Sequence, residues 1–324
     1  MNNKFNNRTL LLIFIGLAAL FTLSRLSRVR EGDRSLMSEL AVIDTSRVST
    51  FSIFPASESG REIKFTREGP DWRIASGDLN APASSQAVRS LLAEIGSLEA
   101  EQLVARDPDR WVEFQVVDSL GTRILIKEGS RVVVDLIAGR FQYQPPPQGN
   151  YNMYGQNQGS GRTYIRLSGE DEVYSVDGFF ALSVNQGFDR WRDQTLSRIN
   201  KTALSRIRFD YPADSGYVAQ NAESGWMVAG LPADSASMDH YLNRITRTSL
   251  TEFEDSYRPV GDADYRLTLE GDQFKPVVIR AFSVEDSTFV INSSQNPESW
   301  FRVGDLERFS GIFPGSSSLL PEGR

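Results

Sequence analysis

The sequence has 324 residues, of which 40 % are hydrophobic and 24 % charged, a composition typical of globular proteins. It contains no cysteine, which excludes disulfides, thiolate metal sites and cysteine nucleophiles. Residues 1–30 hold five of the 35 basic residues and no acidic one, so the rest of the chain carries 30 basic against 42 acidic residues, a net charge of −12. Because nucleic-acid phosphates attract basic surfaces, this acidic body argues against nucleic-acid binding.

The first element in the chain is an uncharged run, TLLLIFIGLAALFTL, from Thr9 to Leu23. As a helix it spans about 22 Å, or about 27 Å when extended to Leu26, against a hydrocarbon core of about 30 Å. We expect an uncleaved transmembrane anchor within residues 1–30; a cleaved signal peptide and a buried helix are the alternatives. Basic residues flank both sides of the run, so the positive-inside rule does not decide its orientation.

After a polar juxtamembrane stalk at residues 31–46, the pattern predicts a first α+β repeat over residues 47–200. A helix with an N-cap at Ser84 or Ser85 is expected over residues 84–100. Strands are expected at residues 49–55, 61–68, 71–75, 101–105, 122–129, 131–144, 162–169 and 172–178. The segment 179–199 is expected to be a helical or mixed connector.

A second α+β repeat is predicted over residues 201–314, followed by a tail at 315–324. Two helices are expected, at residues 235–247 and 305–313. Strands are expected at residues 205–212, 216–224, 225–230, 251–257, 264–272, 276–286, 288–295 and 299–304. Because hairpin signals are many and helices few, the fold class is α+β with mostly antiparallel sheets.

The two halves match in order and in detail, which indicates an internal duplication. Trp72 in DWRIA corresponds to Trp226 in GWMVAG, and both are interpreted as structural markers of the repeat. The apolar helix positions match at a constant offset of 150: Val88, Leu91, Leu92 and Ile95 correspond to Met238, Tyr241, Leu242 and Ile245.

One segment belongs to the first repeat only. Residues 144–161, QPPPQGNYNMYGQNQGSG, contain no charge, three Pro and four Gly, and are expected to form a flexible insert in a hairpin. One hypothesis makes it a contact loop, with Tyr151 and Tyr154 as stacking or docking groups, and Tyr143 just before it is a further candidate interaction residue. The alternative is a tolerated hairpin insertion.

A search for catalytic, cofactor and metal signatures yields no candidate residue. The single histidine, His240, falls off the apolar stripe of its helix and is interpreted as a solvated surface residue. The acidic run GEDEV at 169–173 lacks EF-hand spacing and is interpreted as a hairpin turn. Nucleophile-elbow, phosphate-loop and dinucleotide-binding patterns do not occur either, so we expect a protein that is not an enzyme and has no cofactor.

The densest group of Arg and aromatic residues is GFDRWRDQTL at 187–196. Arg190, Trp191 and Arg192 are candidate interaction residues, because Trp and Arg are enriched at interface hot spots. The alternative is a latch in which the same residues pack the connector between the halves and pair with Asp189 and Asp193.

Taken together, five parts of the sequence resemble the domain of unknown function 4340 family of bacterial envelope proteins. They are the N-terminal anchor with its trailing LSR, the DWRIA strand, the helix VRSLLAEIGSLEAEQLVA, the segment TYIRLSGEDEVYSV and the connector FDRWRDQTLSRI. The resemblance covers most of the chain after residue 40. It implies a protein anchored in the inner membrane with its globular part on the periplasmic side. It also implies association with ABC transporter systems of the gliding-motility type, and it transfers no catalytic residue.

Two functions follow as expectations. The first is a non-enzymatic accessory or interaction subunit that docks onto a transporter or envelope complex. The second is an extracytoplasmic module that binds a small molecule or a glycan. An unusual hydrolase is a distant third alternative.

Overall fold

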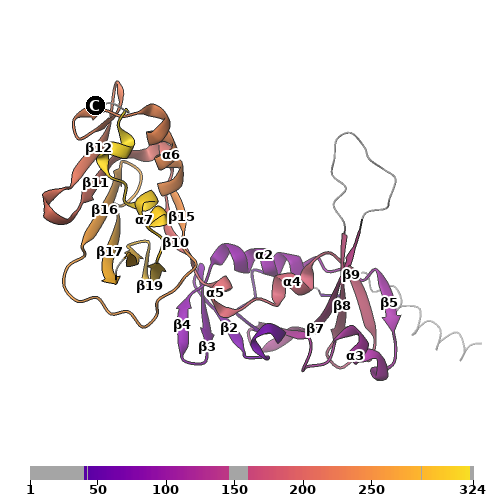
Figure 1. Cartoon of the computed structure of the whole chain (residues 1–324). Helices are drawn as coiled ribbons and strands as arrows, with labels where there is room; N and C mark the ends of the chain where they lie inside the picture. Colours follow the sequence, from indigo (N-terminus) through magenta and orange to yellow (C-terminus); the bar gives the residue numbers. More distant parts are fainter. Residues whose placement is uncertain (1–39, 42, 146–159, 286, 322–324) are drawn as a thin grey trace, which may run out of the picture. The chain divides into compact units, whose positions relative to one another are not determined.

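A computed structural model describes residues 40–41, 43–145, 160–285 and 287–321 of the protein. These residues form two large antiparallel sheets with helices packed on them, which confirms the α+β class (Figure 1). The expected anchor lies outside the described residues. Within the described part of the chain, no helix is long and apolar enough to cross a membrane.

The chain groups into two compact units, Met1–Lys64 with Arg89–Gln186, and Phe65–Val88 with Gly187–Arg324. The boundary expected from the sequence, between residues 200 and 201, stays a prediction.

The first sheet has nine strands in the order β4-β3-β2-β1-β6-β7-β8-β9-β5. Its strands are β1 (Thr50–Phe54), β2 (Ile63–Glu68), β3 (Asp71–Ser76), β4 (Leu79–Pro82), β5 (Gln102–Ala105), β6 (Thr122–Glu128), β7 (Arg131–Gln144), β8 (Ser160–Leu167) and β9 (Val173–Asp177). The alternation in β6, where Ile124 and Ile126 are fully buried between more exposed neighbours, shows how a period of two places one face of a strand in the core.

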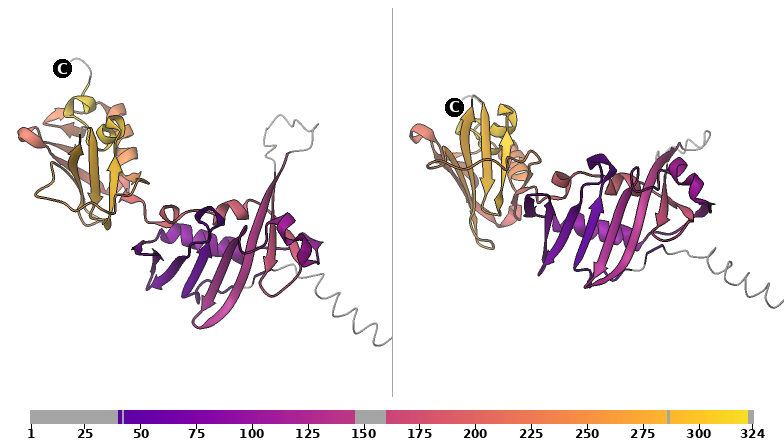
Figure 2. Two further views of the ribbon diagram at one scale, coloured as in Figure 1. Left: turned by 60° about the horizontal axis from the view of Figure 1, so that its bottom comes forward. Right: turned by 90° about the horizontal axis from the view of Figure 1, so that it is seen from below.

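The main helix of this half is α2 (Ser85–Gly96), which lies along one face of the nine-stranded sheet (Figure 2). The side chain of Ser84 accepts a hydrogen bond from the backbone N–H of Ala87 at 3.3 Å, so Ser84 is the N-cap. Three short helices follow in the chain, α3 (Trp111–Phe114), α4 (Phe180–Val184) and α5 (Phe188–Trp191).

The second sheet has eight strands in the order β14-β13-β12-β11-β16-β17-β18-β19. Its strands are β11 (Leu204–Asp210), β12 (Tyr217–Ala222), β13 (Gly225–Val228), β14 (Leu231–Pro232), β16 (Tyr265–Gly271), β17 (Val277–Glu285), β18 (Thr288–Ser293) and β19 (Asn296–Val303). A separate two-stranded sheet joins β10 (Thr195–Arg198) and β15 (Arg247–Ser249).

Helices α6 (Ser235–Ile245) and α7 (Leu306–Ile312) share one hydrophobic core with the inner face of the eight-stranded sheet. Asp234 caps α6 by accepting the backbone N–H of Ser237 at 2.8 Å, and Asp305 caps α7 by accepting that of Glu307 at 2.9 Å. After α7, a short 3-10 helix, η5 (Ser316–Leu319), buries Leu319 in the same core.

The two large sheets follow one strand order. Reading β4 as β14, β3 as β13 and so on to β9 as β19 reproduces the second order from the first. A helix follows the fourth strand in each half, and its apolar stripe is buried in each: Val88, Leu91, Leu92 and Ile95 in α2, and Met238, Tyr241, Leu242 and Ile245 in α6. The fifth strands differ, because β5 pairs with β9 whereas β15 pairs with β10.

The structure corrects one expected strand and adds short elements. Residues 251–257 do not form a strand; they contain one isolated bridge, from Phe253 to Phe301. The short strands β4 and β14 were not expected; each follows a turn containing a glycine with positive φ, Gly77 and Gly230. The acidic residues of the run, at 170–172, lie between β8 and β9, as expected of a hairpin turn, and Val173 begins β9.

Candidate functional site

The structure separates the predicted interaction residues into exposed and buried ones. Tyr151 and Tyr154 lie outside the described residues. Tyr143 is 55 % exposed near the end of β7, and Arg190 is exposed on α5. Trp191 and Arg192 are buried, at 5 % and 2 % exposure.

Arg192 is held by two carboxylates and two rings. Its Nη1 donates to Asp189 at 3.2 Å, and the pair of Nη1 and Nη2 donates to both oxygens of Asp255. Its guanidinium lies 3.6 Å from the ring centroid of Phe253 and 5.7 Å from that of Phe188. The ring of Trp191 meets Phe65 edge-on, with centroids 5.6 Å apart. Trp191 and Arg192 therefore have their contacts inside the fold, and whether they act as a latch between the halves stays a prediction.

The two repeat markers also lie inward. Trp72 is 5 % exposed on β3, and Trp226 on β13 is partly buried against the core of the eight-stranded sheet. Each is the second residue of its strand.

An exposed apolar surface lies where β7 approaches α4; we call it the β7–α4 surface and define it by Phe141, Tyr143, Phe179 and Leu182. Phe179 and Leu182 are 47 % and 48 % exposed, close to the 55 % of Tyr143. The rings of Phe141 and Phe179 are in contact, with centroids 5.2 Å apart. Phe141 and Tyr143 alternate with Gln142 along β7 and therefore share one face of the strand.

Gly161 makes this arrangement of rings fit. It faces Tyr143 across the β7–β8 ladder, and a β-carbon on it would overlap both the ring of Phe141 and the carbonyl oxygen of Gly178. The sequence carries one signal for the surface, because two adjacent rings cannot both face the core; in the pair Phe179–Phe180, Phe180 is the one that is 1 % exposed.

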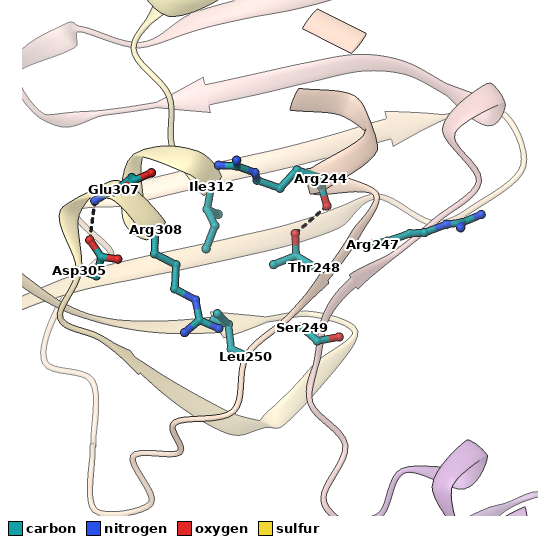
Figure 3. Close-up of a pocket in the computed structure, with 9 residues that line it drawn as sticks. All are labelled: Arg244, Arg247, Thr248, Ser249, Leu250, Asp305, Glu307, Arg308 and Ile312. Atoms are coloured by element: carbon teal, nitrogen blue, oxygen red, sulfur yellow. Dashed lines mark hydrogen bonds between the residues drawn. The ribbon is translucent and has the colours of Figure 1, made fainter. Parts of the chain in front are cut away.

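Two pockets flank the contact between α6 and α7. The first, the β15 pocket, has a volume of about 530 Å³ and is lined from α6, β15 and α7 (Figure 3). Figure 3 shows Arg308 extending from α7 toward Leu250, whereas Arg247 extends away from the other side chains. Asp305 and Glu307 also line this pocket, so its charges are mixed.

The second, the η5 pocket, has a volume of about 420 Å³ and lies between α6, the end of α7 and η5. Arg244 lines both pockets. Its guanidinium lies beside Gly311 of α7, where a β-carbon would overlap Nη1. Its Nη2 is 3.1 Å from Nε2 of His240, which is exposed as expected.

One buried and two partly buried tyrosines hold the wall of the η5 pocket in place. The hydroxyls of Tyr211 and Tyr217 donate to the carbonyl oxygen of Pro314 at 2.9 and 2.7 Å, and that of Tyr241 donates to Ile312 at 3.1 Å. Burial raises the pKa of all three phenols far above the usual value of 10.0, so they remain neutral donors. The chain after α7 is therefore held in one place by neutral hydrogen bonds.

Among the described residues, no group of three or more His, Asp or Glu side chains is placed to hold a metal ion. The two pockets could not be predicted from the sequence, because Arg244 and Gly311 come into contact only when α6 and α7 pack on the same core.

Comparison with known proteins supports one assignment. A family model described as Domain of unknown function (DUF4340) matches residues 72–268, more than half of the 324 residues. No curated protein and no solved structure matches the chain. The matched residues run from Trp72 on β3 through the β7–α4 surface to Thr268 on β16, and the chain belongs to the DUF4340 family.

Proposed function

We propose that this protein is a non-enzymatic docking subunit of the bacterial envelope, anchored by residues 9–26, with its body on the periplasmic side of the inner membrane. The observation that carries the proposal is the β7–α4 surface. Single exposed apolar residues are ordinary on protein surfaces, but contiguous groups of large ones characterise interaction sites. Aromatic side chains in particular supply large contact area at low entropic cost.

We infer that the two sheets are tandem copies, and comparing them supports a special role for this surface. Helix α4 follows β9 as α7 follows β19, and their N-caps are Phe179 and Asp305. Three residues after the cap stand Leu182 in the first copy and Arg308 in the second. An apolar pair in the first copy thus replaces a charged pair in the second, which suits binding of a partner by the first copy only.

The partner class is a further part of the proposal. The acidic body disfavours nucleic acid, and the apolar rings suit a protein surface. The family resemblance implies subunits of an ABC-type transporter, which makes these the first candidates to test.

Site-specific photo-crosslinking in intact cells tests the proposed contact. A photoreactive phenylalanine replaces Tyr143 or Leu182 in the full-length protein, and a control places it at Val112, which is 63 % exposed on α3. We expect one common crosslinked partner from the first two positions and not from the control. Crosslinking of the same species with equal yield from all three positions would contradict a specific docking surface.

A further inference from the structure

We propose that the η5 pocket is a binding site for a small organic anion, a carboxylate attached to a compact apolar body. This site lies on α6 and α7 and is independent of the docking role proposed for the β7–α4 surface. Its volume of about 420 Å³ lies toward the lower end of small-molecule sites, which are about 300–1,000 Å³.

The lining of the η5 pocket carries a positive charge that has no carboxylate partner in the pocket. Arg244 is the one charged residue of its lining, which contains no carboxylate. No salt bridge found among the described residues includes Arg244. The nearest acidic residue on the same helix, Asp239, is paired with Lys201 and accepts a hydrogen bond from Asn243 at 3.0 Å. The lining of the η5 pocket is therefore positive, whereas Asp305 and Glu307 belong to the lining of the β15 pocket, which Arg244 also borders.

The contact with His240 leaves that charge in place. A guanidinium only donates hydrogen bonds, so in this contact Nη2 of Arg244 donates and Nε2 of His240 accepts, at 3.1 Å. An imidazole carries no negative charge, so it orients the guanidinium without cancelling its charge. The remaining N–H groups of Arg244 stay available for a carboxylate, whose two oxygens match the planar guanidinium.

The walls of the pocket favour an apolar body on the anion. Tyr241 and Leu319 line it with 4 % and 3 % exposure, and Pro314 closes one side. The hydroxyl of Tyr241 donates to the carbonyl oxygen of Ile312, so this residue adds no free polar group to the wall. The hydroxyls of Ser310 and Ser318 donate to backbone carbonyls at 2.8 and 2.7 Å, so these two side chains do not compete with Arg244 as donors.

A substitution at Gly311 tests the position of the Arg244 guanidinium directly. A β-carbon there would overlap Nη1 of Arg244, the end of a flexible side chain that can move aside at low cost. Gly311→Ala should therefore displace the guanidinium without unfolding the protein, since alanine favours a helix more than glycine does. Arg244→Gln removes the charge, and Arg247→Gln is the matched control, because Arg247 lies outside the η5 pocket and extends away from its neighbours in Figure 3.

The test is calorimetric titration of the full-length protein in detergent with benzoate, with neutral benzamide of the same shape and with acetate, which lacks the apolar body. We expect saturable one-to-one binding of benzoate, and binding of benzamide and of acetate weaker by about tenfold or more. Arg244→Gln and Gly311→Ala should each weaken benzoate binding by about tenfold, while Arg247→Gln stays within about twofold of the wild type.

Each of several results would overturn the proposal. They are equal affinity for benzoate and benzamide, unchanged benzoate binding in Arg244→Gln, and no saturable benzoate binding at concentrations up to about 10 mM. Acetate binding as tightly as benzoate would remove the role of the apolar wall and contradict the ligand class. Because none of these variants touches the β7–α4 surface, their outcome is separate from that of the docking experiments.

Discussion

Arg192 and Asp255 form a two-point ion pair in which Nη1 donates to Oδ2 at 2.8 Å and Nη2 donates to Oδ1 at 2.6 Å. The side chain of Arg192 is 2 % exposed and that of Asp255 is 44 % exposed. The pair ties the segment after α5 to the loop between β15 and β16, and the ring of Phe253 covers the guanidinium. A cation taken out of water in this way depends on its partner.

Removal of both partners should cost less unfolding free energy than the sum of the two single removals. Asp255→Ala leaves a buried guanidinium short of compensating charge and is expected to cost about 3 kcal/mol of unfolding free energy. Arg192→Met removes the charge and keeps an apolar side chain over Phe253. Because no unpaired charge then remains, Arg192→Met/Asp255→Ala should lose less unfolding free energy than the sum of the two single losses. Urea denaturation of the four proteins measures this coupling. Strictly additive losses would show that the pair contributes nothing beyond its separate side chains.

Asp135 should stabilise the first sheet only while its carboxylate is ionised. Burial tends to raise its pKa, but hydrogen bonds from Arg123 at 2.9 and 2.8 Å and from Ser168 at 2.7 Å outweigh burial and hold the pKa below the usual 3.8. A lowered pKa gives stability that is present above the unfolded-state value and lost as the pH falls through the folded-state value.

We therefore expect Asp135→Asn to lower the unfolding free energy by about 1–2 kcal/mol at pH 7. The difference from the wild type should shrink as the pH falls below 3.8, the usual pKa of the group. Denaturant titrations at a series of pH values measure it. A difference that stays constant down to pH values well below 3.8 would contradict the role of ionisation.

Glu94 on α2 should show the opposite pH dependence. Burial raises the pKa of its carboxyl above the usual 4.5, and the hydrogen bond from Ser183 at 3.2 Å offsets this only in part. The folded state then binds a proton more tightly than the unfolded chain, so stability falls as the pH rises from the unfolded-state pKa through the folded-state pKa. Glu94→Gln removes this penalty and keeps an acceptor for Ser183.

The expected result is a variant more stable than the wild type at pH 7 by about 1 kcal/mol or less, with the gain vanishing below pH 4.5. Thermal unfolding at both pH values checks the change. A loss of stability in Glu94→Gln at pH 7 would mean that the ionised carboxylate is favourable where it lies.

The periplasmic placement can be tested because the chain has no cysteine. Val260, at 91 % exposure, is replaced by Cys in the full-length protein and treated with a membrane-impermeant maleimide on spheroplasts. We expect labelling without permeabilisation. Ala219→Cys, at a fully buried position, is the control and should be labelled only after denaturation. Labelling of Val260→Cys only after the membrane is opened would place the body in the cytoplasm.

Much of the fold could be predicted because the strands alternate and the helix stripes are regular. Val88 and Met238 occupy matching positions of α2 and α6, and both are buried, as their helical spacing predicts. The segment 251–257 was mispredicted because its alternating aromatic and acidic residues imitate a strand. In the structure, Phe253 instead covers a buried arginine, and this tertiary contact overrides the local pattern.

The candidate sites were less predictable because they depend on residues far apart in sequence. Tyr143 was identified from its place beside the insert, whereas Phe179 and Leu182 join it only through the packing of α4 on β7. The η5 pocket depends on Gly311 giving space to Arg244 from another helix, and no local pattern reports such a contact. The group of Arg and aromatic residues around Trp191 is conspicuous only by its composition. Composition alone does not distinguish a buried latch from an exposed interface.

The docking role of the β7–α4 surface is the central claim. The most direct test compares how much partner protein is recovered with a triple variant of this surface and with a double control variant elsewhere. Tyr143→Ser/Phe179→Ser/Leu182→Ser removes the exposed part of the β7–α4 surface, and Val112→Ser/Leu120→Ser removes two other apolar side chains that are 63 % and 45 % exposed. Each protein, at equal membrane abundance, is purified from detergent extracts and its partners are quantified against the wild type. We predict that the triple variant loses about tenfold or more of the partner that crosslinks to position 143, while the control retains it. Equal recovery of that partner by all three proteins would contradict the account.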